Sequence, residues 1–303
     1  FNSYLKKSMS KLEFIIGATA VGKTDYAINY AKKINAEIIS CDSLLVYKGM
    51  NIGTAKPSKK ELNEITHHCI NLYPVNQLCD ITMYTKYANM AVEKILKRGK
   101  PIIITGGSGF YLKSFFEPII DTVKISPDTR KIVNKMFIEE GLNGLLNKLN
   151  KLNPDGLSGL DTNNPRRVQR ALERVITSGK SLQELKTDFL KRDKPFNEFS
   201  KEVIHLSRDS KELKDRVKIR VDNMIKNGLI EEVSDLITQG IEKNPSAANA
   251  IGYRETIAFL RNRIQKSELI PLIVKNTYSL IKKQNTWFRT QFKDINKKDI
   301  LLN

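Results

Sequence analysis

The chain has 303 residues, enough for two domains or for one large domain that carries an insertion. Its composition, 40% hydrophobic and 8% aromatic, excludes a disordered chain, and no apolar run is long enough for a membrane span or a secretory signal. The three cysteines show no CxxC spacing, which excludes a disulfide framework, so we expect a reducing compartment, the cytoplasm. The formal charge of +18 indicates a polyanionic partner, and residues 261–303 alone carry ten basic and three acidic side chains.

Four short segments are apolar on both faces, which is typical of buried parallel strands: residues 12–16, 36–40, 101–105 and 203–206. A helical pattern at 24–34 lies between the first two. From Phe116 to about Ser200 only helical patterns occur. The sequence therefore predicts an α/β fold with a parallel sheet core, residues 1–120 and 200–303, ending in basic helices. A helical insertion domain, residues 121–199, interrupts this core.

The segment between the first strand and its helix fits the phosphate-loop motif GxxxxGK[ST] at each fixed position: Gly17, Ala18, Thr19, Ala20, Val21, Gly22, Lys23 and Thr24. Backbone N–H groups of such a loop surround phosphate oxygens at a helix N-terminus. Lys23 supplies a positive charge, and the Thr24 hydroxyl is a ligand for Mg²⁺. The motif predicts a P-loop NTPase-like core that binds a diphosphate or triphosphate, without specifying which.

Polar residues follow the other predicted strands directly. Asp42 comes after the second strand, and Gly106, Gly107 and Ser108 come after the third. Ligands of open parallel sheets gather outside the carboxyl ends of the strands, so we expect these residues and the phosphate loop to line one crevice. Asp42 is the candidate for a catalytic base or a Mg²⁺ partner. A helix cap or turn role for this aspartate is the alternative.

Eight segments, in order along nearly the whole chain, resemble the tRNA dimethylallyltransferases, also called tRNA isopentenyltransferases. They are residues 17–24, DSLLVY at 42–47, GMNIGTAKP at 49–57, HHCIN at 67–71, GGSGFY at 106–111, NPRRVQRALE at 164–173, AIGYRE at 250–255 and KQNTWFR at 283–289.

The resemblance implies transfer of a dimethylallyl group from dimethylallyl diphosphate to tRNA. The acceptor would be the exocyclic amine of the adenosine 3′ of the anticodon, position 37, and diphosphate would leave. The phosphate loop would then hold the diphosphate, with Mg²⁺ on Thr24. The resemblance makes Asp42 the general base, which fits the weak nucleophilicity of an adenine amine, and it places Ser108 in the same catalytic site. The target base must first leave the anticodon-loop stack.

Two arginines accompany the apolar stripe of a predicted helix, Arg216 and Arg220, one turn apart. The resemblance implies that they clamp the diphosphate.

The resemblance also implies contacts with the tRNA anticodon stem-loop, and the basic clusters agree with it because only 14 of the 51 basic residues are arginine. The implied residues are Ser43, Leu44, Leu45, Ser108, Arg130, Arg166, Arg167, Val168, Gln169, Arg170, Arg254, Lys282, Lys283, Gln284, Trp287 and Arg289. A salt-bridged helix face is the alternative for the arginine cluster, and a core position is the alternative for Trp287. Leu45 stands where the family commonly has Gln, and Ser108 where it commonly has Thr.

Three other functions remain open at this stage. An adenylate isopentenyltransferase, which acts on free AMP, ADP or ATP, shares the phosphate loop and Asp42 but needs neither the insertion nor the basic tail. A small-molecule P-loop kinase leaves the Arg166 cluster without a role. A non-catalytic RNA-binding module would need no phosphate loop. The spacing of His67, His68 and the cysteines does not favour a zinc site. We expect a monomer that does not bind a membrane.

Overall fold

The computed structural model describes residues 11–119, 123–293 and 295–302. The chain divides into two compact units. One contains the residues up to 115 and those from 196 onward, and the other contains residues 116–195. Among the described residues, no helix is both long enough and apolar enough to cross a bilayer.

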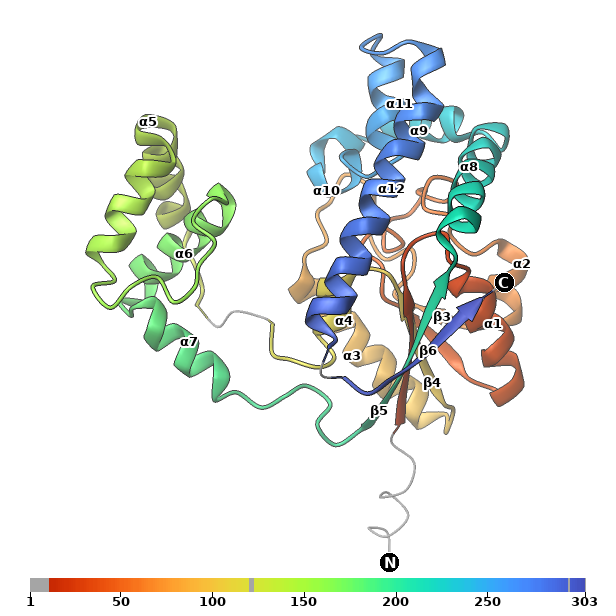
Figure 1. Cartoon of the computed structure of the whole chain (residues 1–303), viewed down its shortest axis with the longest axis horizontal. Coiled ribbons are helices and arrows are strands. Elements are labelled where there is room, and N and C mark those ends of the chain that lie inside the picture. Colours follow the sequence, from red (N-terminus) through yellow and green to blue (C-terminus); the bar gives the residue numbers. More distant parts are fainter. Residues whose placement is uncertain (1–10, 120–122, 294, 303) are drawn as a thin grey trace, which may run out of the picture. The chain divides into compact units, whose positions relative to one another are not determined.

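The first unit is built on a single parallel sheet of six strands, in the order β3-β2-β4-β1-β5-β6 (Figure 1). The strands are β1 (Lys11–Gly17), β2 (Glu37–Ser40), β3 (His67–His68), β4 (Ile102–Gly106), β5 (Ser200–Arg208) and β6 (Lys297–Leu302). Because every pair is parallel, the carboxyl ends of the strands all lie at one edge of the sheet. The predicted α/β fold with a P-loop-like parallel sheet is confirmed.

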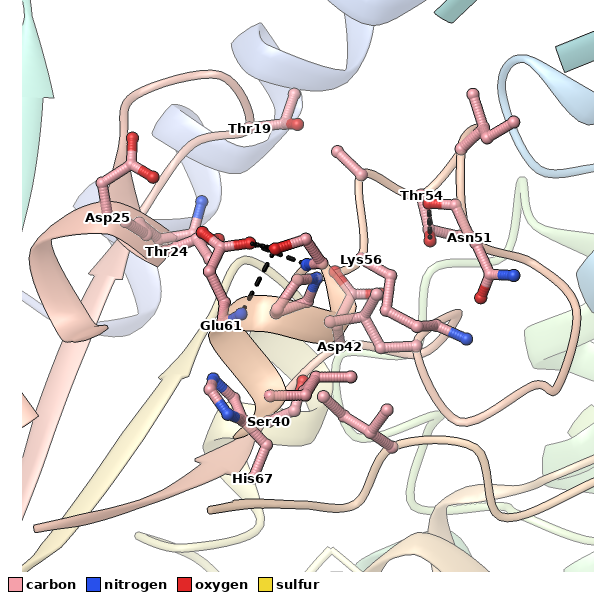
Figure 2. A pocket seen from close by; sticks show the side chains of 18 of the residues that line it. Thr19, Thr24, Asp25, Ser40, Asp42, Asn51, Thr54, Lys56, Glu61 and His67 are labelled. Atoms are coloured by element: carbon pink, nitrogen blue, oxygen red, sulfur yellow. Dashed lines mark hydrogen bonds between the residues drawn. The ribbon is translucent and has the colours of Figure 1, made fainter. Parts of the chain in front are cut away.

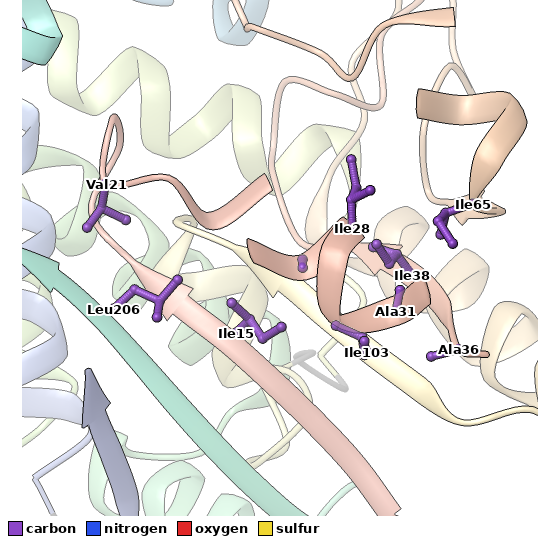
Figure 3. Packing of buried hydrophobic residues seen from close by; sticks show 10 residues of the cluster. Ile15, Val21, Ile28, Ala31, Ala36, Ile38, Ile65, Ile103 and Leu206 are labelled. Carbon is purple, nitrogen blue, oxygen red and sulfur yellow. The ribbon is translucent and has the colours of Figure 1, made fainter. Parts of the chain in front are cut away.

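Helices surround this sheet. They are α1 (Lys23–Ile34), α2 (Lys59–Glu64), α3 (Ile81–Lys97), α4 (Gly109–Lys113), α8 (Ser210–Lys226), α9 (Leu229–Thr238), the short 3₁₀ helix η1 (Ile241–Lys243), α10 (Pro245–Ala248), α11 (Tyr253–Leu260) and α12 (Lys266–Gln291). In one core cluster, Ala27 and Ala31 of α1 pack on strand residues such as Ile15, Ile38 and Ile103 (Figure 3). Small side chains at these positions let α1, which follows the phosphate loop, lie close to the sheet.

The end of the chain differs from the prediction of basic C-terminal helices. The helix α12 ends at Gln291, and residues 297–302 form the edge strand β6. Ile300 and Leu302 pack against the sheet core, and the His205 ring bonds the Asp299 carboxylate across the β5–β6 pair at 2.7 Å. The sequence did not predict this strand. Its six residues begin with two lysines and an aspartate, and an edge strand that is so short and polar lacks the buried apolar run by which the central strands are recognised.

In the described residues of the second unit the helices are α5 (Pro127–Lys151), α6 (Pro165–Ser178) and α7 (Leu182–Leu190). Their apolar faces form a separate core that includes Val133, Leu145 and Leu172. Serine or asparagine caps the start of each helix by accepting a backbone N–H bond. Gly141, at φ 66° and ψ −162°, breaks α5 into two parts.

Candidate active site

The phosphate loop joins β1 to α1 in a conformation that needs its glycines. Gly17 has φ 151°, and a Cβ there would lie 2.5 Å from the Leu206 carbonyl oxygen, so no larger residue fits. Gly22, at φ 102°, directly precedes α1. Ala20 also has positive φ, 65°, which is uncommon for a residue with a Cβ. The loop therefore adopts a backbone conformation that its glycines allow but that is unfavourable at Ala20.

Three cationic side chains hold this loop from its carbonyl side. The Lys23 ammonium donates to the Ala18 carbonyl at 2.6 Å. From β5 and α8, Arg208 Nε donates to the Val21 carbonyl at 2.9 Å and Arg216 Nε donates to the Ala20 carbonyl at 3.0 Å. Arg216 was expected at the diphosphate, whereas nothing in the sequence pointed to Arg208. These bonds fix the peptide planes of the loop before any ligand is present.

An open pocket of about 1010 Å³ lies against this loop (Figure 2). Its lining joins the phosphate loop and the start of α1, the end of β2, the loop before α2, and α8. Its charged or polar lining residues include Lys23, Thr24, Asp42, Thr54, Lys56, Arg216 and Arg220. The structure thus brings the predicted phosphate loop, the candidate base and both candidate arginines to one cavity. Leu45 also lines it.

Asp42 lies among cations in this pocket. One of its oxygens accepts the Leu44 N–H at 2.8 Å, which gives it the turn role considered as an alternative. No other described residue hydrogen-bonds this carboxylate. Burial lowers the pKa of Lys23 to about 8, and both Asp42, which raises it, and Arg220, which lowers it further, act on this ammonium. Burial likewise lowers the pKa of Lys56 to about 8 and lowers that of Arg220, and Asp42 opposes the shift at both.

Lys56 was quoted in the sequence motif but not expected in the site. Its ammonium donates to the Tyr47 carbonyl at 2.7 Å and to the Asn71 side-chain oxygen at 2.6 Å. A cation that interacts electrostatically with Asp42 and faces the same pocket adds to the positive field that Lys23 and Arg220 already supply. The pocket therefore favours an anionic ligand.

The loop that carries Lys56 is held by one carboxylate from α9. Glu232 accepts the backbone N–H groups of Asn51, Ile52 and Gly53 at 3.0, 2.8 and 3.3 Å, and the Tyr253 hydroxyl donates to it at 2.7 Å. Gly53 has no room for a Cβ, which would lie 2.5 Å from the Tyr253 ring. No sequence pattern predicts this contact, because the partners lie about 180 residues apart.

The loops after β2 and β4 meet beside Asp42. The Ser43 N–H donates to the Ser108 hydroxyl oxygen at 3.1 Å. The helix α12 packs on the same β4 loop, because the Trp287 ring lies over Gly109, where a Cβ would be 2.4 Å from it. Trp287 also contacts the rings of Phe288 and Phe292. The half-buried ring therefore takes a packing role, the alternative to base stacking, over at least part of its surface.

The residues expected to contact tRNA are spread over both units. In the second unit, Arg166, Arg167 and Arg170 are exposed on α6 and are called the arginine face below. Arg167 lies 3.6 Å from Asp161, and Arg170 pairs with Glu173, so acidic partners are present. Val168, which was also expected to contact RNA, is completely buried, so neither its side chain nor its backbone offers a surface to RNA.

The other expected RNA contacts differ in exposure. Arg130, at the start of α5, and three residues of α12, Lys282, Lys283 and Arg289, are exposed, whereas Gln169 is half-buried. Arg254 is exposed and donates to the Glu255 carboxylate at 2.6 Å. Gln284 has its side-chain amide occupied at both ends, by the Thr19 N–H and the Gly107 carbonyl.

A Mg²⁺ ion fits the donor set of this pocket when a diphosphate supplies most of its ligands. Thr24 brings a hydroxyl to the lining and Asp42 a carboxylate. Mg²⁺ in phosphate sites is held by one or two protein oxygens together with phosphate oxygens and water. In the part of the chain that the structure describes, no group of three or more His, Cys, Asp and Glu side chains could hold a metal ion by itself.

Comparison with known proteins decides what kind of site this is. The family model described as IPP transferase matches residues 45–291. A tRNA dimethylallyltransferase of Opitutus terrae is 45% identical over 284 residues, which cover 94% of this chain and 91% of that protein. The chain belongs to the IPP transferase family.

Solved structures agree with this family assignment. The tRNA isopentenylpyrophosphate transferase of Bacillus halodurans superposes with a TM-score of 0.70 at 31% identity, covering 97% of this chain and 90% of that one. A eukaryotic dimethylallyltransferase that acts on tRNA superposes with a TM-score of 0.81 at 28% identity, covering 96% of this chain and 74% of that one. This family member is therefore an enzyme of the prenyl transferase class, and the tRNA-directed interpretation of the sequence is favoured over a free-adenylate transferase, a kinase or a non-catalytic module.

Proposed function

We propose that this enzyme transfers a dimethylallyl group from dimethylallyl diphosphate to the exocyclic amine of adenosine 37 in tRNA. The observation that carries the proposal is the pocket itself. A phosphate loop, Lys23, Arg216 and Arg220 line a cavity whose lining also includes the Asp42 carboxylate. Such a transfer needs cations that stabilise the leaving diphosphate and a carboxylate that accepts a proton, and this cavity brings the two together.

The reaction forms one bond and breaks another at the same carbon. The adenosine amine nitrogen attacks C1 of the dimethylallyl group, and the bond from C1 to the diphosphate oxygen breaks with its electron pair going to oxygen. The phosphate loop, Arg216 and Arg220 stabilise the negative charge that develops there. Asp42 takes the proton that the amine loses as its new bond forms.

The geometry of Asp42 supports this role. The bond from the Leu44 N–H orients the carboxylate, while its second oxygen has no hydrogen-bond partner among the described residues. Ser108, whose hydroxyl accepts the Ser43 N–H, lies on the neighbouring strand end, so Ser43 and Ser108 would border the target base. Leu44 and Leu45 follow directly in the chain.

We assign Mg²⁺ to Thr24, because its hydroxyl lines the pocket at the start of α1. When bound, this ion would neutralise charge on the leaving diphosphate.

The tRNA anticodon stem-loop would be held by basic side chains of both units. In the second unit these are Arg130 and the arginine face, with Gln169. In the first unit they are Arg254 and the exposed α12 residues Lys282, Lys283 and Arg289. The exposed positions of these cations support the proposal, since phosphate contacts need accessible charge.

We further propose that the enzyme works as a monomer in the cytoplasm. The three cysteines are free and buried, which fits a reducing compartment. Light scattering of the purified protein gives its mass in solution directly.

A substrate panel tests the proposal. Labelled dimethylallyl diphosphate is offered with unmodified tRNA, with the same tRNA carrying guanosine at position 37, and with AMP. We expect label only in the first tRNA, on the amine of adenosine 37. Transfer to AMP but not to tRNA would assign the chain to free adenylates, and release of phosphate from ATP without label transfer would indicate a kinase.

A further inference from the structure

One side chain of α12 links the two loops that border the pocket. The Gln284 side-chain oxygen accepts the Thr19 N–H at 2.9 Å, and its side-chain nitrogen donates to the Gly107 carbonyl at 2.9 Å. Thr19 belongs to the phosphate loop, and Gly107 to the loop after β4. In sequence these partners lie 265 and 177 residues from Gln284.

The link leads on to the candidate base. Gly107 is followed by Ser108, whose hydroxyl accepts the Ser43 N–H, and Ser43 is followed in the chain by Leu44, which donates to the Asp42 carboxylate. A continuous series of hydrogen bonds and peptide units thus connects the phosphate loop to Asp42 through Gln284. Each of its loops follows a different strand, β1, β4 or β2.

The packing around Gln284 shows that the contact is specific. Gly107 is buried, and the Gln284 amide lies so close to it that a Cβ on Gly107 would be 2.7 Å from the amide nitrogen and would displace this side chain. One turn further along α12, Trp287 covers Gly109 and Phe288 is buried. The backbone of α12 is therefore packed closely against the β4 loop at this point, which places the Gln284 side chain within reach of both loops.

We propose that Gln284 is a positioning residue that sets the distance between the phosphate loop and the loop carrying Ser108. It acts through Thr19 and Gly107 and need not touch either substrate. Its Thr19 bond also occupies one backbone N–H of the phosphate loop, which leaves the later N–H groups of the loop for the diphosphate. This inference rests on the proposed function for its kinetic test but has a binding test that does not.

Two substitutions of Gln284 distinguish the hydrogen bond of its side-chain oxygen from that of its side-chain nitrogen. In Gln284→Ala both bonds are lost. In Gln284→Glu an oxygen still accepts the Thr19 N–H, but an ionised carboxylate repels the Gly107 carbonyl, whereas a protonated one donates to it. Gln291→Glu makes the same chemical change on the same helix, where the Gln291 side-chain oxygen accepts an exposed hydrogen bond from the Lys113 ammonium at 3.2 Å.

The first measurement is the affinity for inorganic diphosphate by calorimetry. We expect Gln284→Ala to weaken it by about 2- to 13-fold, the net contribution of one hydrogen bond, because its partners are part-buried, and we expect Gln291→Glu to leave it unchanged. Wild-type affinity in a folded Gln284→Ala protein would overturn the inference even if the wild-type enzyme transfers no prenyl group. Normal wild-type binding of diphosphate without any transfer would instead contradict the proposed function alone.

The second measurement is single-turnover transfer at saturating substrates between pH 5.5 and pH 8. Relative to wild type, Gln284→Glu should lose rate at high pH and recover it as the new carboxyl becomes protonated, while the ratio for Gln284→Ala stays constant with pH. A purely structural role would lower the melting temperature of both variants without this pH-dependent ratio. A Gln284→Glu rate equal to that of wild type across this pH range would therefore refute a positioning role, and this variant still decides the matter if Gln284→Ala fails to fold.

Discussion

Proton uptake on diphosphate binding follows from the lowered pKa of Lys23. Burial lowers this pKa from 10.5 to about 8 in the ligand-free protein. A group with a pKa of about 8 is protonated to about 0.9 at pH 7 and to about 0.1 at pH 9. Since only the ammonium form attracts a diphosphate, and the bound anion raises the pKa again, we expect the affinity to fall about tenfold over this interval.

The lowered pKa of Lys23 has the opposite effect on folding stability, which rises with pH where the affinity for diphosphate falls. The unfolded chain keeps the ordinary pKa of 10.5, so between about pH 8 and pH 10.5 it binds more protons than the folded chain at this site. The ligand-free protein therefore gains stability from Lys23 as the pH rises through this window, while it loses affinity for diphosphate.

Calorimetry in buffers of different ionisation enthalpy measures the protons directly. At pH 8 we expect about half a proton to be taken up per diphosphate bound at Lys23. Lys23→Met should remove the Lys23 share of this uptake and weaken the affinity, and the pH dependence that remains should be that of Lys56. Lys56, whose pKa is also lowered to about 8, is the matched control, and Lys56→Met should leave the Lys23 share in place. If Lys23→Met keeps the uptake and Lys56→Met removes it, the assignment of the phosphate-binding lysine is refuted.

Three further predictions concern the other parts of the site. Arg220→Ala should weaken dimethylallyl diphosphate binding by about 10- to 150-fold and leave tRNA binding unchanged. Lys218→Ala, on the exposed side of α8, should change neither affinity. Equal effects of the two substitutions would show that Arg220 does not bind the diphosphate. Glu232→Gln should lower the free energy of unfolding by about 1–3 kcal/mol in denaturant titrations and raise the KM for dimethylallyl diphosphate, with Glu231→Gln as the control. Unchanged values would show that Glu232 does not stabilise the loop 51–53. Replacing the arginine face by glutamine should weaken tRNA binding and reduce the salt slope of log K by about 0.7–0.9 per lost phosphate contact, and an unchanged slope would exclude these arginines from the RNA interface.

The sequence predicted those features that local pattern controls. The central strands are apolar on both faces, and the phosphate loop is recognised by residues adjacent in the chain, so both could be located without a structure. The two-residue strand β3 and the edge strand β6 were missed because neither carries a buried apolar run. The edge position of β6 also changes the design of experiments, since deleting residues 280–303 would remove a strand of the sheet as well as basic side chains.

Contacts between distant residues could not be predicted in the same way. Gln284 and Trp287 stand in a basic, aromatic segment that favours an RNA contact, yet the structure turns one amide toward two loops and packs the indole over Gly109. Glu232 resembles any other helix carboxylate until the loop 51–53 is seen to donate to it. Such roles depend on tertiary placement, which a single sequence does not encode locally.

Single-turnover transfer to tRNA by Asp42→Asn tests the central claim most directly. The asparagine side-chain oxygen can still accept the Leu44 N–H, so the turn is kept while the basic oxygen is lost. At saturating substrates and across a Mg²⁺ series, we expect both substrates to bind and the chemical step to slow by about 10²–10⁴-fold at every Mg²⁺ concentration. Recovery at high Mg²⁺ would make Asp42 a metal partner instead. A rate within about threefold of wild type, with at most about 1 kcal/mol of stability lost, would leave it only the turn role and contradict the mechanism.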